Sequence, residues 1–345
     1  MYIAGLWVVR NVHASRKAAV IAIAAAIQLI PLAGPVLLSR DVYLYWDFGR
    51  IGAIHGGNPY SDTPRRFAGD PAFPRIGRDW YDLTLPYGPA FAAVSEGEAA
   101  IVGDSPSTAA WVYRLLAALG VLGLAALLLV RGPFAAALVG WNPLLAIHFA
   151  GGGHNDALMM LLLIGGLLLA ERGRTQLVGA GWVLAAAVKW IPLVFLPLDL
   201  LARWRRGARL PIRGLVASAV VVGGIAFLQY GTTGASAGAS ISRQINALSA
   251  ISLPYRLTQL GLAQRPATLL CGGAFVVAYL VFARGAWRGR ARLGLAASSL
   301  VVAAPWLQPW YVLWPLSLAA FDDDRTACWI GVALSAYLLR DALPL

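Results

Sequence analysis

Charged side chains are scarce in this sequence. Acidic and basic residues make up only 13% of its 345 positions, whereas 59% of the residues are hydrophobic and the mean hydropathy is +0.67. A soluble globular domain carries about twice that share of charge. The composition therefore excludes an ordinary soluble domain and predicts a polytopic membrane protein.

Cysteine is also rare. Cys271 and Cys328 are the only two, and they lie in separate apolar stretches, which predicts small buried side chains and neither a disulfide nor a metal site. The net charge of +12 comes from arginines in short clusters between apolar runs. No RNA- or DNA-binding motif accompanies them, so the positive-inside rule explains the charge and no nucleic-acid partner is predicted.

Long apolar runs predict the membrane helices. The first, at 18–38, follows a basic N-terminal stretch and predicts an uncleaved helix that enters from the cytoplasm. The later runs lie at 108–130, 133–150, 154–170, 175–202, 212–230, 267–283, 292–306, 309–320 and 326–343. We expect one all-α domain over residues 1–345, a transmembrane bundle of about ten to twelve helices or half-helices.

Two polar stretches interrupt these runs. Residues 39–107 are too rich in glycine, proline and charge to span, and they predict a large first external loop. Within it, Glu96 and Glu98 favour an interfacial or re-entrant helix at 87–102 over a lipid-exposed span. Residues 231–266 predict a second external loop.

A broken helix fixes the expected orientation. The sequence Lys189-Trp-Ile-Pro interrupts 175–202, so we predict two short helices that meet near Lys189. The arginine-rich turns then share the cytoplasmic side. Both polar loops, His154, Lys189 and the stretch 304–316 converge on the external face.

Two carboxylates follow the first helix. Asp41 and Asp47 lie beside Tyr45 and other aromatic residues that favour the membrane interface. A carboxylate in that position can act as a general base toward a sugar hydroxyl. An ion pair with Arg40 or Arg50 that holds the loop is the structural alternative.

Lysine is almost absent. Lys17 and Lys189 are the only lysines among 28 basic residues. A compact ammonium group suits a phosphate, and Lys189 stands in an apolar run with no nearby acid. A lysine that snorkels from a helix end is the alternative.

A polar triplet, His154, Asn155 and Asp156, heads the apolar run that follows three glycines. Asn155 or Asp156 alone would be explained by helix capping. His154 is not, because glycines allow a close backbone approach and helix-terminal amides attract anions. We expect His154 to line an anion or sugar site and not to bind a metal.

The remaining candidates lie late in the chain. Gln308, Trp310 and Tyr311 belong to an aromatic turn that suits carbohydrate stacking as well as the membrane interface. Arg243 and Arg256 bring cations to the second external loop, as phosphate ligands or as solvated side chains.

Four segments together resemble the GT-C integral-membrane glycosyltransferases, especially the polyprenol-phosphate-mannose-dependent mannosyltransferases of actinobacteria and the related GT87-type family. They are "RDVYLYWDFGRIGAIHGGNPY", "GGGHNDALMMLLL", "AAAVKWIPLVFLPL" and "PWLQPWYVLWPL", spread from residue 40 to 316. The chain departs from the group in being shorter than its larger members and in carrying Glu96 and Glu98.

The resemblance implies an enzyme of the outer face of the cell membrane. It implies transfer of a sugar, with mannose favoured, from a polyprenyl-phosphate donor to a glycolipid or glycan acceptor, with inversion. Asp41 takes the position of the catalytic acidic residue, and Lys189 and His154 match family positions near the donor phosphate. Arg243 and Arg256 of the second external loop are further candidates for that phosphate site. Asp47, Tyr45, Asn155, Asp156, Gln308, Trp310 and Tyr311 are expected at the sugar or acceptor.

Three questions stay open at this point. Broken helices and intramembrane charge also occur in transporters and lipid flippases, although the chain shows no convincing internal repeat. A catalytically silent GT-C relative is a further alternative. No cofactor is predicted, and one external carboxylate cluster does not define a divalent-metal site, so the metal requirement is left open.

Overall fold

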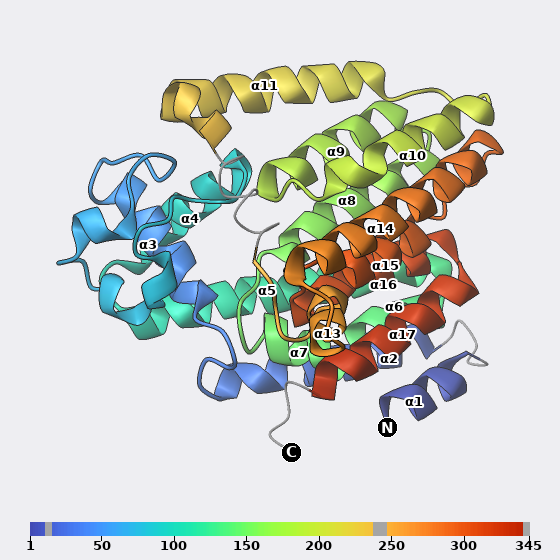
Figure 1. Cartoon of the computed structure of the whole chain (residues 1–345), viewed down its shortest axis with the longest axis horizontal. Coiled ribbons are helices and arrows are strands. Elements are labelled where there is room, and N and C mark those ends of the chain that lie inside the picture. Colours follow the sequence, from blue (N-terminus) through green and yellow to red (C-terminus); the bar gives the residue numbers. More distant parts are fainter. Residues whose placement is uncertain (11–15, 237–246, 341–345) are drawn as a thin grey trace.

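The computed structural model describes residues 1–10, 16–236 and 247–340, and within these ranges all regular structure is helical (Figure 1). This confirms the predicted all-α fold. The α-helices are α1 (Tyr2–Val9), α2 (Lys17–Leu29), α3 (Asp41–Ala53), α4 (Pro89–Val102), α5 (Pro106–Leu128), α6 (Pro133–Gly140), α7 (Pro143–Phe149), α8 (Asp156–Glu171), α9 (Thr175–Val188), α10 (Pro192–Arg205), α11 (Ile212–Tyr230), α13 (Leu253–Gln259), α14 (Gln264–Trp287), α15 (Leu293–Ala303), α16 (Leu313–Asp322) and α17 (Arg325–Leu339).

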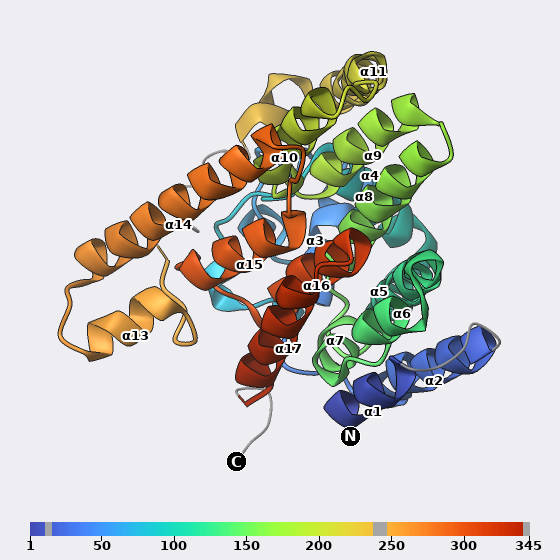
Figure 2. The same cartoon turned by 90° about the vertical axis from the view of Figure 1, so that its right-hand side faces the viewer.

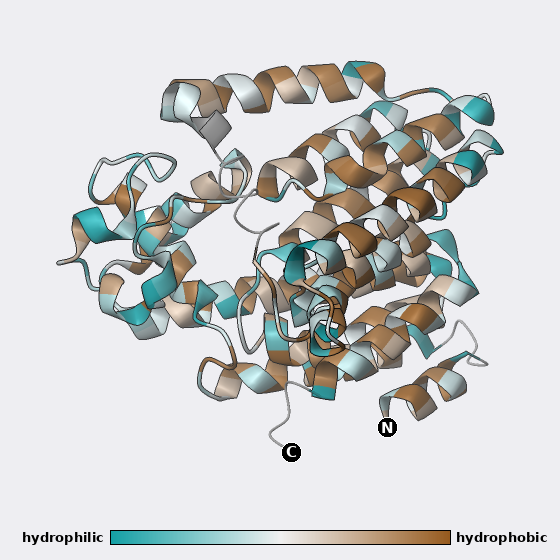
Figure 3. Ribbon diagram, in the orientation of Figure 1, coloured by the Kyte–Doolittle hydropathy of each residue, from teal (hydrophilic) through white to brown (hydrophobic). Residues whose placement is uncertain are grey.

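Within these described ranges, three helical segments are long and apolar enough to cross a membrane: Pro106–Arg131, Ile212–Thr233 and Gln264–Trp287. Hydrophobic residues colour α11 and α14 over most of their length (Figure 3). Many of these side chains are exposed, with Leu228 at 86% and Leu280 at 63%. Apolar surface on this scale is stable against lipid and unstable in water, so the chain is a membrane protein.

The other helices pack as a bundle around α8. This helix lies against α9 on one side and against α5 and α16 on others, while α15 and α17 cover α16. Figure 2 shows α14 to α17 on one side of the bundle and α5, α6 and α8 on the other. The N-terminus of α8 therefore meets residues from both halves of the chain.

Two of the predicted apolar runs are broken helices. Helix α9 ends at Val188, the backbone of Lys189 after it is extended (φ −153°, ψ 133°), and α10 begins at Pro192, which confirms the predicted break. The run 133–150 is also divided, which we did not predict. There Asn142 caps α7 by accepting hydrogen bonds from two backbone amides, and Pro143 takes the first helical position.

The region after the first helix is more ordered than a loop. Helix α2 and a short 3-10 turn end at Ala33, before the predicted limit of 38, and Asp41 begins a helix of its own. Helices α3 and α4 touch so closely that a β-carbon on Gly49 would lie 2.1 Å from the carbonyl oxygen of Ser95. Helix α4 has 14 residues and is not among the candidate spans. Its interfacial or re-entrant placement stays a prediction.

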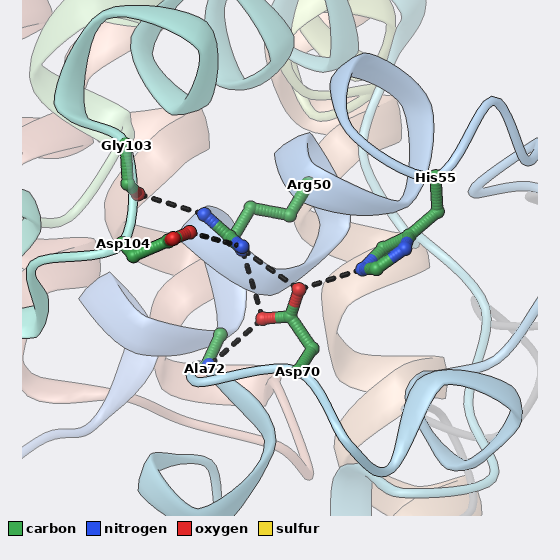
Figure 4. A network of polar contacts seen from close by, with 6 residues as sticks. All are labelled: Arg50, His55, Asp70, Ala72, Gly103 and Asp104. Carbon is green, nitrogen blue, oxygen red and sulfur yellow. Dashed lines mark hydrogen bonds and ion pairs between the residues drawn. The ribbon is translucent and has the colours of Figure 1, made fainter.

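A buried ion-pair network holds this region together (Figure 4). The Arg50 guanidinium donates to Asp70 at 2.8 Å, to Asp104 at 2.7 Å and to the carbonyl oxygen of Gly103 at 2.7 Å. His55 lies 2.6 Å from Oδ2 of Asp70, one of the two carboxylate oxygens to which Arg50 donates. Arg50 therefore connects α3 to the loop after it and to the end of α4. Because Arg50 binds these groups, it does not form the ion pair with Asp41 that was the structural alternative.

Replacing Arg50 by alanine should destabilise the protein by about 3–5 kcal/mol, because it leaves the carboxylate of Asp70 buried without its main partner. Burial raises the pKa of Asp70, but the Ala72 amide, Arg50 and His55 outweigh that effect and lower it. The stabilisation is thus complete above the unfolded pKa of about 4 and is lost as the pH falls below it. Thermal unfolding of both proteins between neutral and acidic pH checks this: the difference should shrink in acid, and a pH-independent difference would contradict the assignment.

Candidate active site

A glycine turn places His154. The three glycines 151–153 connect α7 to α8, and Gly153 adopts φ +72°, a conformation that favours glycine. A β-carbon on Gly153 would lie 2.3 Å from Cγ1 of Val42, and one on Gly151 would lie 2.0 Å from the carbonyl oxygen of Ile147. The turn thus packs directly on the first turn of α3, which carries Asp41.

Asp41 and His154 face each other across this contact. Nδ1 of His154 lies 3.4 Å from Oδ2 of Asp41, and the imidazole is fully buried. The ring stacks on Trp310, with ring centroids 3.5 Å apart and planes 13° apart. Burial raises the pKa of Asp41, but the contact with His154, the Ser39 hydroxyl and the charge of Lys189 outweigh burial. The pKa therefore lies below its usual value. The carboxylate is therefore ionised at neutral pH.

Lys189 is paired with Asp156. Its ammonium nitrogen lies 3.0 Å from each oxygen of the Asp156 carboxylate, which also accepts a 2.7 Å hydrogen bond from Nε1 of Trp314. The expectation that Lys189 has no nearby acid is wrong, because Asp156 is distant only along the chain. The ammonium group also lies 4.8 Å from the ring centre of Tyr311, a cation–π distance.

The capping explanation for the triplet is not supported. Asn155 occupies the N-cap position of α8, but its side chain makes no capping hydrogen bond. The carboxylate of Asp156 instead accepts hydrogen bonds from Lys189 and Trp314. Both residues are buried, at 5% and 0% exposure.

One cavity of about 390 Å³ joins the predicted residues. We call it the Asp41 cavity. Asp41 and Lys189 line it, and the turn after α15 contributes Gln308, Trp310 and Tyr311. The ring of Trp310, which lines this cavity, is the one on which His154 stacks. The predicted convergence of the first polar loop, the α9–α10 break and the late aromatic turn is therefore present.

Further residues of the Asp41 cavity were not singled out from the sequence. Arg40, Trp80 and Tyr87 line it as well, beside Trp306 of the predicted aromatic turn. Arg40 was considered only as an ion-pair partner of Asp41. Its position directly before the candidate base was the one available signal, since Trp80 and Tyr87 reach the cavity only through the fold of the segment between α3 and α4.

Other predicted residues lie away from the cavity. Asp47 is buried within α3, at 2% exposure, and Tyr45 is buried behind the cavity wall, edge-on to Tyr87 with ring centres 5.4 Å apart. Arg256 lies on α13, and its Nε donates to the Tyr337 hydroxyl at 3.3 Å. Arg243 lies outside the described residues. No binding role follows from the positions of Asp47, Tyr45 and Arg256.

The fold and the site define a class: a helical membrane protein in which one carboxylate and two cationic side chains, Arg40 and Lys189, line an aromatic-walled cavity. Residues 1–205 match the family described as "Alpha-(1->6)-mannopyranosyltransferase, N-terminal domain". The chain therefore belongs to the alpha-(1->6)-mannopyranosyltransferase family, which confirms the resemblance noted in the sequence.

Individual relatives agree with this assignment. The chain is 30% identical over 324 residues to alpha-(1->6)-mannopyranosyltransferase A of Mycobacterium tuberculosis, covering 82% of this chain and 61% of the relative. It is 28% identical over 367 residues to alpha-(1->6)-mannopyranosyltransferase B of Corynebacterium glutamicum, covering 90% and 60%. The chain thus spans about three fifths of the length of these relatives. No solved structure matches it.

Proposed function

We propose that this protein transfers a mannosyl group from a polyprenyl-phosphate donor to a hydroxyl of a lipid-linked or glycan acceptor, at the external face of the membrane and with inversion. The observation that carries the proposal is the Asp41 cavity, where an ionised carboxylate and an ammonium group share an aromatic-walled space. The names of the relatives support a mannosyl group and an alpha-(1->6) linkage.

Asp41 acts as the general base in this mechanism. Its carboxylate removes the proton from the acceptor hydroxyl while that oxygen attacks the anomeric carbon. His154, held by its stack on Trp310, fixes the orientation of Asp41. The bond between the anomeric carbon and the phosphate oxygen breaks as the new bond forms, so one displacement inverts the configuration.

Charge compensation on the leaving side falls to Lys189 and Arg40. The donor phosphodiester carries one negative charge, and the departing polyprenyl phosphate carries nearly two. Cations at fixed positions therefore stabilise the transition state more than the bound donor. Arg40 supports this role because it lines the Asp41 cavity and also an adjoining polar cavity of about 490 Å³ that includes Arg75.

The aromatic walls suit the sugar. Trp310 and Tyr311 present ring surface to the Asp41 cavity, and Gln308 supplies an amide that can bind a sugar hydroxyl. The first polar region and the late aromatic turn then face outside, as the positive-inside rule predicts.

A transfer assay tests the proposal. Purified protein in lipid nanodiscs is incubated with radiolabelled polyprenyl-phosphate mannose and a membrane lipid extract, and the labelled products are identified. We expect a mannosylated lipid or glycan. No transfer from this donor, together with transfer from a nucleotide sugar, would overturn the donor assignment.

A further inference from the structure

A second pocket lies on the other side of His154. It has a volume of about 380 Å³ and is formed between α4, α5 and α8. We call it the Glu98 pocket. His154 lines it and also contacts Asp41 of the first cavity, so one side chain connects the two sites.

The inner end of the Glu98 pocket holds buried polar atoms without partners. Oε2 of Glu98 and both side-chain polar atoms of Asn155 find no hydrogen-bond partner among the described residues. The two side chains are 8% and 5% exposed. Burying such atoms unpaired costs about 1–3 kcal/mol each, so native proteins rarely leave them so. Their concentration around one pocket points to a bound group that supplies both donors and acceptors.

The outer end of the pocket is apolar and open. Leu116, Leu119 and Val94 line it and are 46%, 49% and 36% exposed. The two leucines lie on α5, within a segment long and apolar enough to cross a membrane. This end of the pocket therefore suits hydrocarbon chains of a lipid.

Charge decides which lipid fits. Among the residues that the structure describes, no lysine or arginine lines the Glu98 pocket, and a carboxyl group lies at its inner end. This disfavours a phosphate there. The amide of Asn155 can donate and accept hydrogen bonds, and the carboxyl of Glu98 can accept them. Hydroxyl groups, which both donate and accept, are suitable partners for this pair.

We propose that the Glu98 pocket binds an uncharged, hydroxyl-bearing lipid of the glycolipid type, with its head at Glu98 and Asn155 and its chains along α5. Such a lipid has the hydroxyl that the proposed transfer requires, and it is held beside His154. Binding at the pocket does not depend on transfer, so the two proposals fail separately.

Lipid retention measured without any donor tests this site. The purified protein is exchanged into micelles that contain a monoglycosyl diacylglycerol, plain diacylglycerol or phosphatidylglycerol, and bound lipid is counted by native mass spectrometry. We expect one glycosyl diacylglycerol to be retained, diacylglycerol to be held more weakly and phosphatidylglycerol not to be retained. Retention of phosphatidylglycerol to the same extent would overturn the proposal.

Variants separate the pocket from general lipid binding. Glu98→Leu should reduce retention about tenfold, the value of one lost polar contact. Its unfolding temperature in plain detergent should be unchanged or higher, because a buried carboxyl with an unsatisfied oxygen is gone. Leu116→Trp should also reduce retention by filling the outer end, with no change at the polar end. Glu171→Gln, which removes a carboxylate outside the pocket, is the control and should bind as the original protein does. Unchanged retention in both pocket variants would contradict the site.

Discussion

Asp41→Asn is expected to reduce mannosyl transfer by roughly two to four orders of magnitude, the range that general-base catalysis contributes. The amide keeps the size of the carboxyl group and can still contact His154, but it cannot take up the acceptor proton. Donor binding should change little, because the base acts on the acceptor. The measurement is the rate of transfer from radiolabelled polyprenyl-phosphate mannose by detergent-purified protein with a matched unfolding temperature.

The control is Asp323→Asn. Asp323 is exposed and adopts φ 51°, a left-handed conformation that asparagine tolerates well. The same chemical change far from the Asp41 cavity should leave the rate unchanged. Because the pKa of Asp41 is lowered, the original protein should keep Asp41 ionised through the neutral and mildly acidic range. Normal transfer by folded Asp41→Asn would remove Asp41 from the role of base.

Local patterns in the sequence were sufficient for the long apolar helices and for the break between α9 and α10. Pro192, three residues after Lys189, cannot continue a helix without the loss of a hydrogen bond. In the structure α9 ends at Val188, and Pro192 begins α10. The break between α6 and α7 depends on the cap formed by Asn142. An asparagine within an apolar run is a weak signal for a cap, because its side chain can also bond elsewhere.

The sequence predicted which distant segments meet but not the individual side-chain pairs between them. Asp41, Lys189 and Gln308 share the cavity as expected, since each lies at an interruption of an apolar run. The pair between Lys189 and Asp156 was missed because 33 residues separate them. Helix α3 was missed as well, and with it the burial of Asp47 and Tyr45. Their polar and glycine-rich surroundings predicted a loop, whereas packing against α4 stabilises a helix.

Lys189→Met carries the second large expected effect, and it acts on stability and on catalysis together. Methionine keeps the length of the side chain but leaves the carboxylate of Asp156, which is fully buried, with Trp314 as its only hydrogen-bond donor among the described residues. We expect a loss of about 3–5 kcal/mol in the free energy of unfolding. We also expect a large loss of transfer, because the leaving phosphate loses a cation.

A double variant separates the two effects. Lys189→Met combined with Asp156→Asn removes both charges, so most of the lost stability should return, as a thermal unfolding series of the four proteins will show. Transfer should not return, because the phosphate still lacks its ammonium group. Asp156→Asn alone, in contrast, frees Lys189 to face the cavity and should retain use of the donor. If the double variant recovers transfer along with stability, Lys189 serves only to neutralise Asp156, and compensation of the phosphate charge falls to Arg40.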